Sequence, residues 1–140
     1  MSALLSQVVL YKNPSVVGQF CHFHSQYSAP EAEQLFKDLL AWLWLKEQRQ
    51  KSNKSTYLFG PLLILDELWH LFILHTRDYI DFSSRYFGEY LHHEPEPPGF
   101  EHLLTEEELG DYLTDCFEYL DSAWVERRFA LAFDTHSASG

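Results

Sequence analysis

The sequence predicts a small all-α protein, a single-domain bundle of four to five helices. Three observations support this fold class. Apolar residues recur at helical spacing along most of the chain. Residues that commonly cap helices, with proline or glutamate close behind them, precede several of these stretches. No long stretch alternates apolar and polar residues as a half-buried strand would.

The size of the chain suits one core. It has 140 residues, of which 46% are apolar and 16% aromatic, and this is enough to bury one hydrophobic core. We therefore expect one helical domain over residues 1–133. Residues 134–140 lose the apolar spacing and predict a flexible C-terminal tail. The role of residues 1–12 stays open.

The first third of the chain holds two helix starts. Asn13 followed by Pro14 is typical of an N-cap with proline at the first helical position. Ser28, with Glu31 three residues later, has the spacing of a capping box. The helix that Ser28 opens should run to about Gln50.

The most apolar helix should begin after Pro61 and end at Gly88, because glycine readily takes the left-handed conformation that ends helices. Residues 51–60 lose the helical period and predict a loop before it. At about 100° per residue, one apolar arc of this helix faces the core. The arc comprises Leu65, Leu68, Trp69, Phe72, Ile73, Tyr79 and Ile80.

The chain after Gly88 should be extended before it becomes helical again. The prolines in residues 94–99 favour a stiff, extended connection. Thr105 is another cap, and the three glutamates behind it suit the first turn of a helix. A last short element over residues 125–133 has a type that the sequence leaves open.

The composition disfavours several classes of partner and location. A net charge of −11 argues against nucleic-acid binding and against docking on anionic membranes. No apolar run reaches the ~20 residues of a membrane span, and the N-terminus lacks the basic region of a signal peptide. Cys21 and Cys116 do not make a disulfide framework. We therefore expect a cytoplasmic protein of undetermined oligomeric state.

Asp66 and His70 are the first candidate functional pair. They lie on the polar side of the central helix, and side chains four residues apart are neighbours one turn apart. An aspartate and an imidazole at this spacing can ligate one metal ion, or the carboxylate can fix the imidazole's tautomer. His75 points in roughly the opposite direction, so the same ion should not reach it.

A histidine from the His92-His93 pair completes this site if the chain after Gly88 turns back along the helix. Neighbouring side chains of an extended segment point to opposite sides, so at most one of the two should be an inner ligand. We slightly favour His92. Two imidazoles and a carboxylate suit Zn²⁺ or non-haem Fe²⁺. Further side chains that could support the ligands are Thr76, Arg77 and Tyr79.

Three functions remain open. The first is a small soluble helical protein whose His/Asp pocket binds a divalent metal. The second is an acidic protein-interaction module without catalytic activity, which uses its acidic surface or exposed aromatic residues such as Trp42, Trp44 and Trp124. The third is a metal-dependent hydrolase or oxygenase of unknown substrate. The alternative to a metal site is a structural role, in which Asp66 caps the helix or holds His70 by a hydrogen bond.

Four blocks of the sequence resemble bacterial glycine-rich-domain proteins over roughly residues 14–120. The blocks are residues 29–36, residues 65–82, Phe87-Gly88 and residues 92–95. The matching positions are Asp66, Trp69, His70, Thr76, Tyr79, Gly88, His92 and His93. Ser83 stands where relatives often have cysteine, and the glycine-rich segment is absent from a chain with only 6 glycines. The resemblance implies a recurring block and no particular activity.

Overall fold

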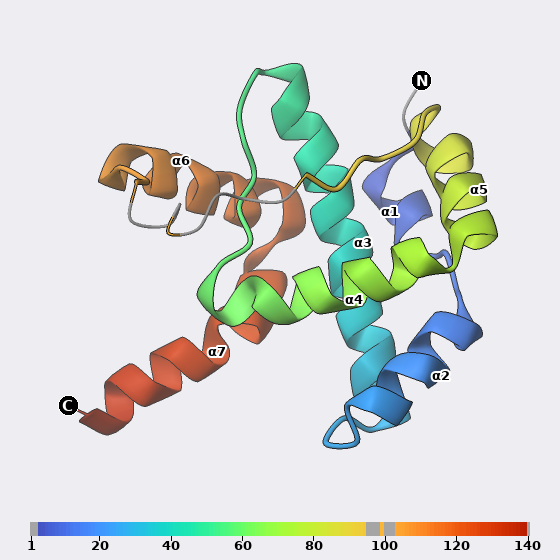
Figure 1. The fold of residues 1–140 in the computed structure, drawn as a ribbon. Coiled ribbons are helices and arrows are strands. Elements are labelled where there is room, and N and C mark those ends of the chain that lie inside the picture. Colours follow the sequence, from blue (N-terminus) through green and yellow to red (C-terminus); the bar gives the residue numbers. More distant parts are fainter. Residues whose placement is uncertain (1–2, 95–98, 100–102, 140) are drawn as a thin grey trace. The chain divides into compact units, whose positions relative to one another are not determined.

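The computed structural model describes residues 3–94, 99 and 103–139, with side chains up to residue 130. These residues form seven α-helices, one 3-10 helix and one π-helical segment, and they contain no strand (Figure 1). The elements are α1 (Leu5–Val8), α2 (Pro14–Phe23), α3 (Ala29–Lys51), η1 (Gly60–Leu62), α4 (Leu63–Leu74), α5 (Thr76–Phe87), α6 (Glu106–Asp115), η3 (Cys116–Leu120) and α7 (Ser122–Ser139). The all-α class is thus confirmed, whereas the predicted number of four to five helices is too low.

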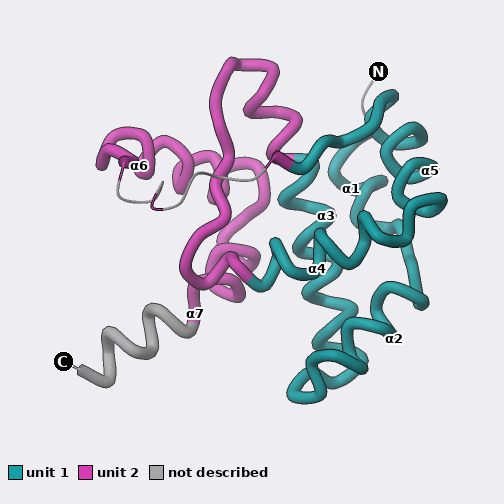
Figure 2. Tube along the Cα trace, viewed as in Figure 1, with its two compact units in different colours: residues 1–44, 64–93 teal, residues 45–63, 94–140 magenta. Residues whose placement is uncertain are grey.

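The chain divides into two compact units (Figure 2). Unit 1 comprises residues 1–44 and 64–93, and unit 2 comprises residues 45–63 and 94–140. The single helical domain over residues 1–133 stays a prediction. The last element is longer than expected, because α7 extends to Ser139 and covers most of the predicted tail, residues 134–140. The flexibility of that tail also stays a prediction, and residues 95–98, expected to be extended, lie outside the described residues.

Side-chain caps begin the helices where the sequence predicts them. Asn13 accepts a hydrogen bond from the backbone of Val16 at 3.2 Å, with Pro14 at the first position of α2. Ser28 and Thr105 each exchange two hydrogen bonds with the glutamate three residues later, at 2.9–3.2 Å. These starts were predictable because each cap depends on residues within one turn of the chain.

The predicted central helix is divided at His75 into α4 and α5, which run in different directions (Figure 1). His75 leaves the helical conformation, with φ −82° and ψ 69°, and its Nδ1 lies 3.0 Å from the carbonyl oxygen of Leu71. The bend also changes which residues face the core. Tyr79 and Phe82 are fully buried, whereas Ile80, expected on the core arc, is 52% exposed.

Aromatic rings fill the core of unit 1. Phe72 lies at its centre, with the ring centroids of Phe36, Tyr79 and Phe82 between 5.0 and 5.3 Å away. Edge-to-face and tilted pairs at such distances are favourable arrangements for buried rings. This packing holds α3, α4 and α5 together, and these helices position the candidate site.

The core of unit 2 contains one of the two cysteines. Burial raises the pKa of the Cys116 thiol to about 12, so this thiol is protonated and unreactive at neutral pH. Beside it, Tyr112 is buried and donates a hydrogen bond to the carbonyl oxygen of Tyr57 at 2.8 Å. Cys21 is half-buried, and both cysteines are free thiols.

We expect Gly88→Ala to lower the free energy of unfolding by about 1 kcal/mol. Gly88 ends α5 in the left-handed region, at φ 77°, which agrees with its predicted role. A methyl group there would meet no atom within 4 Å, so the cost is conformational. Urea denaturation measures it. The matched control is Gly18→Ala inside α2, equally free of neighbours, which should stabilise the protein by ~0.5–1 kcal/mol. Changes in the free energy of unfolding that have the same sign for the two substitutions would contradict this account.

Candidate metal centre

Three side chains that can ligate a metal meet in unit 1. Asp66 and His70 come from α4, and His93 comes from the irregular segment that follows α5. One potential ligand atom from each residue lies within 4.8 Å of the others. The Asp66 side chain is 28% exposed and that of His93 14%, whereas His70 is 58% exposed. The cluster therefore has a sheltered side and an open side.

The two oxygens of Asp66 face different imidazoles. His93 Nε2 lies 2.6 Å from Oδ1, which is a short hydrogen bond in which the ring nitrogen donates. His70 Nε2 lies 3.7 Å from Oδ2, beyond hydrogen-bond distance. The two imidazole rings lie close together, with centroids 4.4 Å apart. One carboxylate thus brings together two imidazoles from segments far apart in the sequence.

Trp69 and Tyr79 set the position of His93. The Trp69 ring lies against the imidazole, with centroids 4.0 Å apart. Trp69 Nε1 donates to the Tyr79 hydroxyl at 2.9 Å, and this hydroxyl donates to the carbonyl oxygen of Leu91 at 2.6 Å. Burial raises the pKa of Tyr79 to about 12, so the phenol keeps its proton at neutral pH. This chain of hydrogen bonds fixes the backbone two residues before His93.

The other predicted site residues lie outside the cluster. The His92 ring lies against Tyr90, with centroids 4.9 Å apart. His93, rather than the slightly favoured His92, faces Asp66, in keeping with the expected alternation of neighbouring side chains. Thr76 and Arg77 are exposed at the start of α5, and no hydrogen bond or ion pair connects them to the cluster among the described residues.

Sequence reasoning gave Trp69 a role in the core and missed its contact with the site. The residue is 2% exposed and packs on Trp42, with centroids 5.4 Å apart, so the core role is real. It also contacts the ring of His93. The signal in the sequence was its place next to His70, but the contact itself depends on how the chain returns after α5.

The tryptophans named as exposed anchors for a protein partner are not exposed. Trp42 and Trp124 are each 2% exposed, and the interpretation of these two as surface residues is wrong. Each lies on the apolar side of a long helix, where burial of a large ring is strongly favourable. Trp44 is half-buried, and its Nε1 donates to the carbonyl oxygen of Ala3 at 3.1 Å.

We expect Tyr79→Phe to cost about 2 kcal/mol of unfolding free energy. The substitution keeps the buried ring but leaves the Trp69 indole N–H and the Leu91 carbonyl without their hydrogen-bond partner. The control is Tyr90→Phe, because Tyr90 is 39% exposed and its ring lies 5.3 Å from that of Tyr79. Urea denaturation of both variants decides: a control that costs as much as Tyr79→Phe would show that the hydrogen bonds contribute little.

The comparisons with known proteins identify a family. Residues 6–108 match the family described as UCP032817-like, and this segment includes all three residues of the cluster. No curated protein and no solved structure matches the chain. The family match corrects the resemblance to glycine-rich-domain proteins, which rested on four short blocks, residues 29–36, 65–82, 87–88 and 92–95. The chain lacks the glycine-rich segment of those proteins. Among the described residues, no helix has the length and hydrophobicity that a membrane crossing needs. Because the match covers well over half of its length, the chain belongs to the UCP032817-like family.

Proposed function

We propose that the protein binds one divalent transition-metal ion, Zn²⁺ or Fe²⁺, through Asp66, His70 and His93. The observation that carries this proposal is the convergence of three ligand-type side chains within 4.8 Å, although Asp66 and His93 are 27 residues apart. Imidazole nitrogen and carboxylate oxygen are the donors that both ions accept, and two histidines with one carboxylate form a known set for each.

The separations of the two imidazoles from the Asp66 carboxylate can be compared with those around a bound ion. A tetrahedral Zn²⁺ about 2.1 Å from each donor keeps the donors roughly 3.4 Å apart. The His70–Asp66 separation of 3.7 Å is close to this value. The His93–Asp66 separation of 2.6 Å is shorter, as expected for two atoms that share a hydrogen bond. An ion that replaces this hydrogen bond would move the two atoms apart, and the exposed His70 ring can turn to meet the ion.

A second candidate function follows from the open side of the cluster. Three protein ligands leave at least one coordination position for water or substrate, as in catalytic sites. Because His70 is 58% exposed, we expect that position to face solvent. A bound ion would supply a Lewis acid and an activated water, which is the chemistry of a metal-dependent hydrolase or oxygenase. The acidic interaction module remains the competing proposal, and it needs no ion.

Metal analysis of the full chain, purified without a histidine tag, tests the proposal. We expect close to one Zn²⁺ or Fe²⁺ per chain, and a melting temperature that falls in chelator and recovers with added Zn²⁺. At a free concentration of 100 times Kd, the ion should add about 2.7 kcal/mol of stability. A metal-free protein whose melting temperature responds to neither chelator nor Zn²⁺ would contradict metal binding and favour the interaction module.

A further inference from the structure

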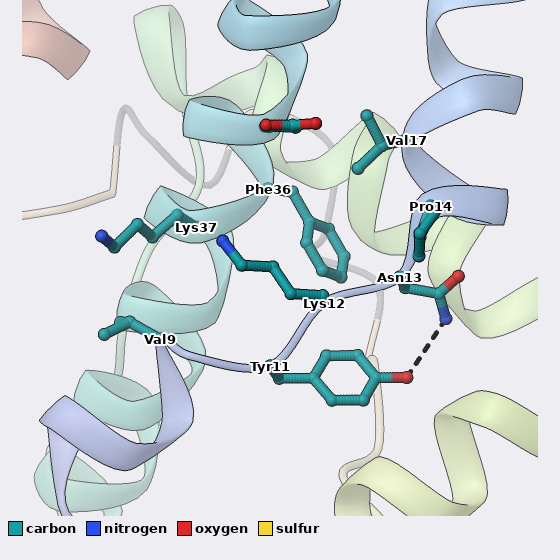
Figure 3. Close-up of a pocket in the computed structure, with 9 residues that line it drawn as sticks. Val9, Tyr11, Lys12, Asn13, Pro14, Val17, Phe36 and Lys37 are labelled. Atoms are coloured by element: carbon teal, nitrogen blue, oxygen red, sulfur yellow. Dashed lines mark hydrogen bonds between the residues drawn. The ribbon is translucent and has the colours of Figure 1, made fainter.

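A second candidate site lies in unit 1 and shares no residue with the metal cluster. It is a cavity of about 220 Å³ formed by residues 9–14, α2 and α3 (Figure 3). This volume equals roughly seven molecules of liquid water, and it is smaller than pockets for drug-sized ligands. The space therefore suits one small organic molecule.

The walls of the cavity are mainly apolar. Val9, Pro14, Val17 and Phe36 contribute hydrocarbon surface, and Phe36 and Val17 are buried in the core of the unit. Figure 3 shows the Phe36 ring between the lysines and the start of α2. A wall held in place by core packing is already formed before a ligand arrives, which lowers the entropy cost of binding.

The polar groups at the base of the cavity already have protein partners. Asn13 donates to the Tyr11 hydroxyl at 3.1 Å and to Asp78 at 3.0 Å, while its side-chain oxygen accepts from the backbone of Val16. The first of these bonds is drawn in Figure 3. These groups hold the 9–14 segment against α2 and α5. Because these groups are already hydrogen-bonded, other side chains must bind the polar group of a ligand.

Lys12 and Lys37 supply the positive charge of the cavity lining. Both line the cavity, and their ammonium groups lie on the same side of it in Figure 3. Neither forms an ion pair with any described residue, although the chain has 21 acidic and only 10 basic residues. Glu33 also lines the cavity, so the lining carries a net charge of about +1 in a strongly acidic protein. A lining with this net charge favours a ligand with one negative charge over a phosphate or a polyanion.

We propose that this cavity binds a small monoanionic organic acid. The ring or branched chain of the acid would lie against Phe36 and Val17, and its carboxylate would lie between the ammonium groups of Lys12 and Lys37. The ligand class follows from three properties: a volume for one small molecule, an apolar wall, and two lysines that have no carboxylate partner in the described part of the chain.

Amide NMR of the full chain tests the proposal with benzoate, phenylacetate and cyclohexanecarboxylate, each titrated to millimolar concentration. At least one acid should cause saturable shifts in residues 9–17 and 33–37. Benzamide, the uncharged counterpart of benzoate, should bind at least several-fold more weakly. The double substitution of Lys12→Met and Lys37→Met should weaken binding of the acid about tenfold. Lys51→Met, the same change at an exposed lysine outside the cavity, should leave binding unchanged.

Several results would overturn the proposal. They are the absence of saturable shifts with all three acids, shifts confined to the neighbourhood of Asp66, His70 and His93, benzamide binding as tightly as benzoate, and unchanged affinity in the double variant. Thermal unfolding of each lysine variant confirms that it is folded, and both lysines are exposed, so the substitutions should leave stability nearly unchanged.

Discussion

Arg49→Met is expected to lower the free energy of unfolding by about 3 kcal/mol, the largest stability change of the substitutions considered. Arg49 is 3% exposed, near the end of α3. Its guanidinium pairs with Asp115 and, at 3.2 Å, with Asp111, and its Nε donates to the carbonyl oxygen of Ser55 at 2.8 Å. Methionine keeps much of the side-chain volume but leaves the carboxylate of Asp115, only 15% exposed, without its buried cation.

Chemical denaturation followed by circular dichroism measures this cost, and Lys54→Met is the matched control. Lys54 pairs with the same Asp111 at 3.1 Å, but both side chains are 43% exposed. Exposed pairs contribute about 1 kcal/mol or less. Equal effects of the two substitutions would show that the burial of Arg49 does not set the strength of its contacts.

The same network makes stability depend on pH in a known direction. The hydrogen bond from Lys54, assisted by Arg49, lowers the pKa of Asp111 below its ordinary value of 3.8. A carboxyl group whose pKa is lower in the folded state stabilises the fold above its unfolded pKa. This contribution is therefore complete above about pH 4 and is lost as the pH falls through the folded pKa. Lys54→Met should accordingly cost less at acidic pH than at neutral pH.

His93→Ala is expected to weaken Zn²⁺ binding by at least about 100-fold, whereas His92→Ala should leave it nearly unchanged. The two histidines are adjacent, so they share backbone environment and residue type. Only His93 lies 2.6 Å from Asp66, while the His92 ring lies against Tyr90. Competition of each variant with a chromophoric chelator gives the affinities. Equal losses of Zn²⁺ affinity in both variants would mean that the conformation of residues 92–93, rather than coordination by His93, supports Zn²⁺ binding.

His93 also has a structural role, so its removal needs a second readout. The Co²⁺-substituted protein provides one, because its visible spectrum reports the number and geometry of ligands. His93→Ala should change this spectrum, and Asp66→Asn should change it too, since an amide is a poorer ligand than a carboxylate. Unchanged spectra in both variants would place the ion elsewhere.

The parts of the fold that the sequence predicts are those decided locally. The caps at Asn13, Ser28 and Thr105 use partners three residues away, and Gly88 ends α5 through its own backbone conformation. The break at His75 was missed because a histidine inside an apolar period carries no strong stop signal. The additional helices follow from this break and from α1, whose four residues are too few to show a period.

The candidate site, too, has a part that the sequence predicts and a part that it does not. The Asp66–His70 pair could be predicted, because residues four apart on a helix are neighbours wherever the helix lies. The choice of His93 over His92 could not, because it depends on the hydrogen bonds from Trp69 through Tyr79 to Leu91, which join segments far apart in the sequence. The burial of Trp42 and Trp124 likewise depends on packing that no local pattern reveals.

Anomalous scattering at the zinc absorption edge, from crystals of the protein with Zn²⁺, tests the central claim most directly. We expect one strong peak about 2.0–2.2 Å from an Asp66 oxygen, His70 and His93 Nε2, with His92 turned away. A crystal that shows no peak at these three residues, and retains the 2.6 Å contact between Asp66 and His93, would contradict the metal site and leave the cluster as a hydrogen-bonded part of the fold.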